Sequence, residues 1–279
     1  MKTYRRVAFI GSMIVGCVGF MTLPASAASP AAKVNLSRPL IPINGAGPVE
    51  GSNGINVTYS SNWSGYATLP KTAGETFTSI VANYNVPSVT CSATPDTFSF
   101  HWIGLDGWAD QTVEQDGISA NCKGDSARYN AWYEMYPANS KWQFQVDPGD
   151  AIESAIRSLG HSKYELSLKD VTSNQGFDVV QTCPVSACEN SSAEAITEAY
   201  YYNRHFAGTS DFGDEHYEDA IVTDSAGDVG GLFNPKLWKT GEGIALGEYG
   251  DVDTTPGPLA TAHGLGASSA FSVFWSREN

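Results

Sequence analysis

Hydrophobic residues at every second position, in short runs broken by glycine and proline, constrain the fold of this chain most strongly. This period is typical of strands with one buried face. No long stretch keeps the helical period of 3.6 residues, and no segment repeats at a fixed spacing. We therefore predict an all-β chain of two packed antiparallel sheets, a lectin-like (concanavalin A-like) β-sandwich. The alternating runs cover residues 77–86, 98–102, 142–146, 164–168 and 271–275.

The first 27 residues have the pattern of a secretory signal peptide. Lys2, Arg5 and Arg6 precede an apolar stretch over 7–23, and Ala25-Ser26-Ala27 supplies a cleavage site. Residues 28–57 are rich in Pro, Gly, Ser and Asn, which predicts a short pro-segment or flexible leader. We expect one β-sandwich domain over 58–279, in a protein secreted to the extracellular space.

Charge and apolar content narrow the partners that we expect. Without the three basic residues of 1–27, the net charge of −14 becomes −17. A chain with no basic patch is a poor partner for nucleic acid or for an anionic membrane surface. No later stretch is apolar enough to cross a bilayer. We therefore expect a monomer that binds neither nucleic acid nor a membrane.

Four cysteines remain after the signal peptide. An even number in an exported chain indicates two disulfides, for which three connectivities exist. We favour Cys183–Cys188, which closes a short loop, with Cys91–Cys122 bracing the loops around the strand that carries Gln115. The spacings contain no C-x-x-C pair, so we expect no zinc site, no other metal and no cofactor.

The familiar catalytic motifs are missing from the sequence, which has no G-x-S-x-G and no H-E-x-x-H. The remaining candidates are carboxyls and amides on strands. Glu194 and Glu198 share one face of a predicted strand with Ile196 between them. A buried glutamate on an aromatic-lined sheet is a candidate acid or base, because burial raises the pKa of a carboxyl. A solvated outer face is the alternative.

Five segments form a recognisable set: Ser61-Asn62-Trp63-Ser64-Gly65-Tyr66, Trp102-Ile103-Gly104-Leu105-Asp106-Gly107, 113–118, 131–137 and 270–275. Together they resemble the glutamic peptidases (eqolisins, peptidase family G1), in the form of a secreted member of bacterial type. The similarity runs in the same order over most of the chain. Departures are Asn130, where fungal members carry Asp, and Ala195, where Trp is usual.

The resemblance implies a secreted, acid-active endopeptidase that cuts protein or peptide substrates and is insensitive to pepstatin. It implies Glu198 as general base and Gln115 as the residue that positions water and donates to the oxyanion. The residues implied to line the cleft and position the substrate are Trp63, Trp102, Asp106, Asn130, Trp132 and Glu134.

Two alternatives from other classes remain open on the sequence. One is a secreted β-sandwich glycosidase that uses two carboxylates, Glu134 and Glu198. The other is a lectin-like binding module without catalysis. Assays on protein and polysaccharide substrates in acid separate all three.

Overall fold

The computed structural model describes residues 36–43, 49–50, 55–93, 95–202, 205–247, 258–265 and 269–278. The predicted signal peptide and residues 28–35 lie outside this part of the chain. Every regular element within it is a β-strand, as the alternating pattern predicts. None of the described segments forms a helix that could span a membrane.

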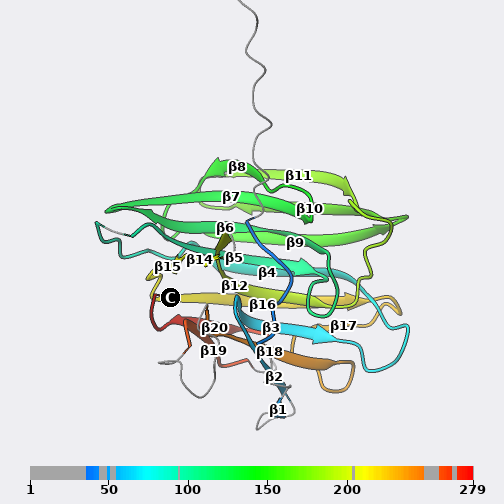
Figure 1. The fold of residues 1–279 in the computed structure, drawn as a ribbon. Helices are drawn as coiled ribbons and strands as arrows, with labels where there is room; N and C mark the ends of the chain where they lie inside the picture. The colour runs from blue at the N-terminus through cyan, green and yellow to red at the C-terminus, as the bar shows by residue number, and fades with distance from the viewer. Residues whose placement is uncertain are drawn as a thin grey trace, which may run out of the picture. The chain divides into compact units, whose positions relative to one another are not determined.

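The first sheet follows the order β8–β7–β6–β5–β12–β3–β18, and each neighbouring pair is antiparallel. β2 adds to β18 in parallel, and β1 pairs with β2. Figure 1 shows these strands stacked from β8 down to β1. The bounds are β8 Lys141–Gln145, β7 Ser126–Tyr136, β6 Val113–Lys123, β5 Thr97–Leu105, β12 Ala193–Ala199, β3 Trp63–Leu69, β18 Lys239–Ala245, β2 Ile55–Ser60 and β1 Val49–Glu50.

The second sheet follows the order β11–β10–β9–β4–β16–β20–β19, again antiparallel throughout. A single pair between β18 and β19, Ala245 opposite Ala260, joins the two sheets along one edge. The bounds are β11 Gln175–Thr182, β10 Lys163–Asp170, β9 Ala151–Gly160, β4 Phe77–Asn85, β16 Asp214–Asp224, β20 Phe271–Trp275 and β19 Ala260–His263. Short strands complete the fold: β13 Tyr201–Tyr202, β14 His205–Phe206, β15 Gly208–Thr209 and β17 Val229–Gly231.

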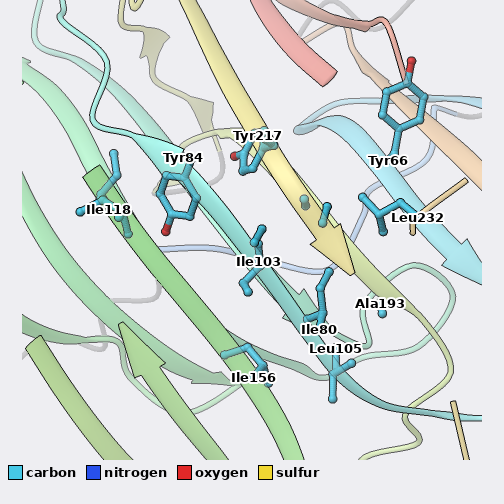
Figure 2. Packing of buried hydrophobic residues seen from close by; sticks show 14 of the residues in the cluster. Tyr66, Ile80, Tyr84, Ile103, Leu105, Ile118, Ile156, Ala193, Tyr217 and Leu232 are labelled. Carbon is cyan, nitrogen blue, oxygen red and sulfur yellow. The ribbon is translucent and has the colours of Figure 1, made fainter. Parts of the chain in front are cut away.

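One hydrophobic core lies between the sheets, so the predicted sandwich is confirmed. Ile103 and Ile118 of the first sheet pack with Ile80, Ile156 and other residues of the second in one buried cluster. Figure 2 shows these side chains meeting between the strands. Because side chains alternate along a strand, the other face of the first sheet carries a separate set of side chains.

Both predicted disulfides are confirmed. Cys91 pairs with Cys122, which lies on β6, the strand of Gln115. Cys183 pairs with Cys188 and closes the short loop after β11.

Part of the predicted pro-segment or flexible leader lies within the described residues. We call residues 36–43 the leader segment, and its leucines are buried: Leu36 is 4% exposed and Leu40 is 8% exposed. β2 begins at Ile55, three residues before the predicted start of the domain. The leader segment is held because it finds apolar partners and backbone hydrogen bonds on the first sheet.

Candidate active site

The outer face of the first sheet carries a second buried apolar cluster, and we call this face the site face. It differs from the core between the sheets because its residues alternate with core residues along the same strands. On β5, for example, Phe100 and Trp102 belong to this cluster while Ile103 and Leu105 belong to the core. The cluster comprises Trp63, Phe100, Trp102, Val113, Trp132 and Ile196, together with Leu36 and Leu40 of the leader segment.

Glu198 lies on the site face, two residues after Ile196 on β12, and is 1% exposed. β12 lies between β3 and β5, which places Trp63 on one side of Glu198 and Phe100 on the other. Its carboxyl accepts hydrogen bonds from Asn62 Nδ2 at 3.0 Å and from Trp102 Nε1 at 3.1 Å. The carboxyl is thus oriented by side chains from two neighbouring parts of the sheet.

Glu198 also binds the leader segment. The Ser37 hydroxyl donates to Oε2, and the backbone N–H of Arg38 donates to Oε1 at 3.1 Å. Burial raises the pKa of Glu198 to about 8, and the four donated hydrogen bonds oppose that rise. Glu198 therefore holds a proton in acid while the leader segment covers it.

Gln115 and Glu134 lie directly opposite each other on β6 and β7, on the site face. Gln115 Nε2 donates to Glu134 Oε2 at 3.1 Å, and Gln115 Oε1 has no hydrogen-bond partner among the described residues. Glu134 also accepts from Ser140 Oγ at 2.8 Å and from the Ser37 N–H at 3.1 Å. Ser37 thus connects the Gln115–Glu134 pair to Glu198.

Glu134 is fully buried, and burial raises its pKa well above the usual range. The hydrogen bonds from Ser140 and Ser37 oppose this rise, and the neighbouring charge of Glu198 adds to it. Two carboxyls that share a buried site do not both ionise readily. The site therefore favours one negative charge rather than two.

The three predicted tryptophans all lie on the site face. Trp63 Nε1 donates to the Arg38 carbonyl at 2.8 Å, and its ring meets that of Trp102 edge-on at 5.0 Å. Trp132 meets Phe100 edge-on at 6.0 Å, and its Nε1 is buried without a hydrogen-bond partner in the described structure. These rings surround Glu198 with apolar surface.

Asp106 and Asn130 are not brought to Glu198. The Asp106 carboxyl accepts backbone N–H groups of Asn190 at 2.9 Å and Ser191 at 2.6 Å, so it braces the loop before β12. Burial, with a smaller contribution from Asp110, raises the pKa of Asp106 to about 6. Asn130 is half-buried and lies opposite Ser119 on β6.

Asn62, Ser37 and Ser140 contact the catalytic candidates but did not stand out in the sequence. Asn62 lies inside the Ser61–Tyr66 motif, so the motif already marked its position in the sequence. Ser37 and Ser140 lie outside the matched motifs, and nothing in their local sequence marks them. The described residues contain no group of three side chains suited to hold a metal ion.

A buried carboxyl beside an amide on an aromatic sheet face is an arrangement suited to acid–base attack by water, as a hydrolase on a β-sandwich would need. The model of the Peptidase A4 family matches residues 61–236, and the chain belongs to that family. It is thus a peptidase of the glutamic type, and neither a glycosidase nor a lectin is favoured. Its assignment to a bacterial type stays a prediction.

Known proteins agree with this assignment. Aspergillopepsin-2 of Aspergillus niger is 24% identical over 198 residues, which are 63% of this chain and 68% of that protein. The structure of scytalido-glutamic peptidase with a transition state analog inhibitor is similar with a TM-score of 0.63 at 21% identity, over 77% of this chain and 98% of that one. Aspergilloglutamic peptidase from Aspergillus niger has a TM-score of 0.52 at 19% identity, over 64% and 99%. The two structures support the fold.

Proposed function

We propose that this chain is a secreted endopeptidase that hydrolyses protein or peptide substrates in acid, with Glu198 as general base and Gln115 as oxyanion donor. One observation carries the proposal: a peptide of the chain itself crosses the site face and places its backbone N–H groups on Glu198 and Glu134. A site that binds the backbone of an extended peptide beside a buried carboxyl suits peptide-bond hydrolysis.

In the proposed reaction, ionised Glu198 takes a proton from water as the water oxygen bonds to the scissile carbonyl carbon. The amide nitrogen of Gln115 carries two N–H groups, and one of them donates a hydrogen bond to Glu134. The other is left for the developing oxyanion, and the unpartnered Oε1 can accept from the attacking water. Because an amide does not titrate, Gln115 stays a donor in acid.

Glu198 then returns its proton to the leaving nitrogen as the C–N bond breaks. The backbone nitrogen of Arg38, 3.1 Å from Oε1, shows that a peptide nitrogen can reach the carboxyl at the distance of a hydrogen bond. The lower pH limit of activity then reflects protonation of Glu198 before attack.

The substrate class has support from a structural relative. SCP-B, a member of the eqolisin family, is known in complex with a tripeptide Ala-Ile-His, with a TM-score of 0.61 to this structure at 19% identity. The acidic mature chain and the two disulfides agree with an extracellular protein. We retain from the sequence a monomer that needs no cofactor and binds neither nucleic acid nor membrane.

The test compares Glu198→Gln with Glu194→Gln, the other glutamate on the same face of β12. Both changes keep the shape of the side chain and remove one carboxyl. We expect Glu198→Gln to abolish hydrolysis of an unfolded protein substrate in acid, and Glu194→Gln to retain most of it. Circular dichroism checks that both variants fold, and a polysaccharide assay run in parallel checks the alternative activity.

A Glu198→Gln protein that keeps more than about a tenth of wild-type kcat has lost less than about 1.4 kcal/mol of transition-state stabilisation. That loss is too small for a general base, and the role of Glu198 would then be rejected.

A further inference from the structure

One large apolar side chain on the site face is exposed: Trp142 of β8 is 47% exposed. It lies directly opposite Trp132 on β7, and directly opposite residues point to the same face of a sheet. Trp142 differs in this position from the other exposed large hydrophobic residues of the described chain, which lie on the second sheet, on β17 beside it or in loops. They are Val81, Leu159, Val171, Val180, Val185, Val229 and Phe274.

Trp142 ends a row of residues that crosses the site face from β12 to β8. Ile196 and Trp102 lie opposite each other on β12 and β5. Gly117 follows on β6, where a Cβ would lie only 2.6 Å from the Trp102 Cβ, so the indole of Trp102 takes the space of a side chain. Trp132 and Trp142 complete the row on β7 and β8. The apolar surface beside the catalytic candidates thus continues, without a polar side chain in this row, to the edge of the sheet.

Trp132 places an unsatisfied hydrogen-bond donor next to Trp142. Its side chain is fully buried, and its Nε1 has no acceptor among the described residues. A buried N–H without an acceptor is costly, and a buried tryptophan usually finds a partner for it. A backbone carbonyl of a bound peptide is an acceptor of the required kind. The unsatisfied donor therefore points to a peptide ligand at this end of the site face.

The edge strand β8 is poorly suited to pairing with a further strand. Figure 1 shows it at the end of the stack, and among the described strands it pairs with β7 alone. The step from Asn130 to Trp132 on β7 is matched by a longer step from Gln145 to Trp142 on β8, so β8 contains a bulge. Bulges interrupt regular pairing and protect the edges of sheets. A ligand of Trp142 is therefore expected to lie over the site face and not to extend the sheet.

The peptide on the site face indicates how a substrate reaches Trp142. The Leu36 N–H donates to Ser140 Oγ at 2.7 Å, and the Ser140 hydroxyl donates to Glu134 Oε1 at 2.8 Å. Ser140 precedes Trp142 by two residues, which is about 7 Å along a strand and about the length of two residues of an extended peptide. With the Arg38 nitrogen in the place of the leaving nitrogen, Leu36 takes the second position before the scissile bond. The third and fourth positions then lie within reach of Trp142.

We propose that Trp142 forms an outer substrate subsite, which receives an apolar or aromatic side chain three or four residues before the scissile bond. This inference rests on the proposed function, because that function defines the scissile bond. The flat face of an indole suits an aromatic or large aliphatic side chain. Such side chains are mostly buried in folded proteins and become accessible in unfolded ones. The subsite therefore favours unfolded substrates with apolar residues on the amino side of the cleaved bond.

The test compares quenched peptides cleaved in acid by the full secreted chain. A short peptide has two residues before the scissile bond, and two long peptides add two further residues, which are both Phe or both Ser. The measured quantity is kcat/KM for each long peptide divided by that for the short one, so the amount of active protein cancels. We expect wild type to prefer the Phe peptide by about tenfold, or about 1.4 kcal/mol, as for one aromatic contact.

Three variants then assign the preference to the indole. Trp142→Ala should reduce it to below about twofold, whereas Trp142→Phe should keep most of it because an aromatic ring remains. Phe274→Ala is the matched control, since Phe274 is 42% exposed on β20 of the second sheet. Its removal should leave the preference at the wild-type value. Circular dichroism checks that each variant folds.

Two results would overturn the inference: a wild type without a preference for the Phe peptide, or a preference that survives Trp142→Ala. Both leave the proposed peptidase activity intact. Failure to hydrolyse any peptide, short or long, would instead reject the proposed function. In that case the affinities of wild type and Trp142→Ala for the long peptides, measured by fluorescence anisotropy, still decide whether Trp142 binds the apolar side chain.

Discussion

We expect the folded state to be stable in acid and to lose stability steeply toward neutral pH. The reason lies in glutamate carboxyls that are buried in the folded chain. Burial raises the pKa of Glu114, Glu194 and Glu215 well above the usual range of a glutamate. Each is at most 1% exposed, and neither oxygen of Glu215 has a hydrogen-bond partner among the described residues.

Among the residues that the structure describes, no cation compensates the charge of an ionised Glu215. His101 Nδ1 lies 3.9 Å from Glu215 Oε2, but burial lowers the pKa of His101 to about 3. The imidazole is therefore neutral in the folded state above that pH, with its two nitrogens next to Thr197 and Ser99 hydroxyls. Ionised Glu215 would be a buried charge without a partner, which is costly.

The sign of the pH dependence follows from proton binding. The unfolded chain releases the proton of each glutamate near pH 4.3, whereas the folded chain keeps it to a higher pH. The contribution of each group is thus fully present below about pH 4.3 and is lost as the pH rises toward its folded pKa. The loss is about 1.4 kcal/mol per pH unit for each group, or about 4 kcal/mol per unit for three. At that slope, a typical stability of about 5–15 kcal/mol is lost within roughly one to four pH units.

Urea unfolding followed by tryptophan fluorescence at pH values from 3.5 to 7 measures this slope. Glu215→Gln should flatten it by about 1.4 kcal/mol per pH unit, because one buried proton is no longer required. Glu153→Gln, an exposed change on β9, should leave the slope as it is. A free energy of unfolding that stays level from pH 4 to 7, or a Glu215→Gln slope equal to that of wild type, would refute the reasoning.

Other predictions concern the site. Gln115→Ala should lower kcat by about 10²–10³-fold, as expected for one oxyanion donor, and a loss below tenfold would count against that role. Trp102→Phe removes the indole donor to Glu198, so the acid limb of the kcat profile should move to higher pH; an unmoved limb would contradict the contact. Pepstatin should not inhibit, because the catalytic candidates are a glutamine and glutamates rather than a pair of aspartates for it to bridge, and chelators should leave the activity intact. Inhibition by pepstatin or by a chelator, measured on a quenched peptide substrate in acid, would contradict a glutamic mechanism.

Much of the fold could be predicted because side chains on a strand alternate whatever lies beside it. Along β5, the alternation of Phe98, Phe100 and Trp102 indicated a strand and also separated the site face from the core face. Alternation does not reveal which strands are neighbours. The pairing of β12 with both β3 and β5 frames Glu198, and it joins segments that are far apart in the sequence.

The site was predicted in part, mainly from the family resemblance. That resemblance implied Glu198, Gln115 and the tryptophans, which the structure places on one face. It also pointed to Asp106, whose carboxyl instead turns to the loop at Asn190 and Ser191. Residue identity gives no direction for a side chain just beyond the end of a strand, where the period of two no longer holds.

The sequence by itself determined the strand-forming segments, the even set of cysteines, the order of the family motifs and the shared face of Glu194 and Glu198. These are properties of local backbone geometry and of residue type. Only the tertiary structure showed that the two glutamates have different surroundings. Glu198 lies beside Trp63, Asn62 and the leader segment, whereas Glu194 lies opposite Gly104. Register between distant strands depends on packing across the whole sheet, and no local pattern contains that information.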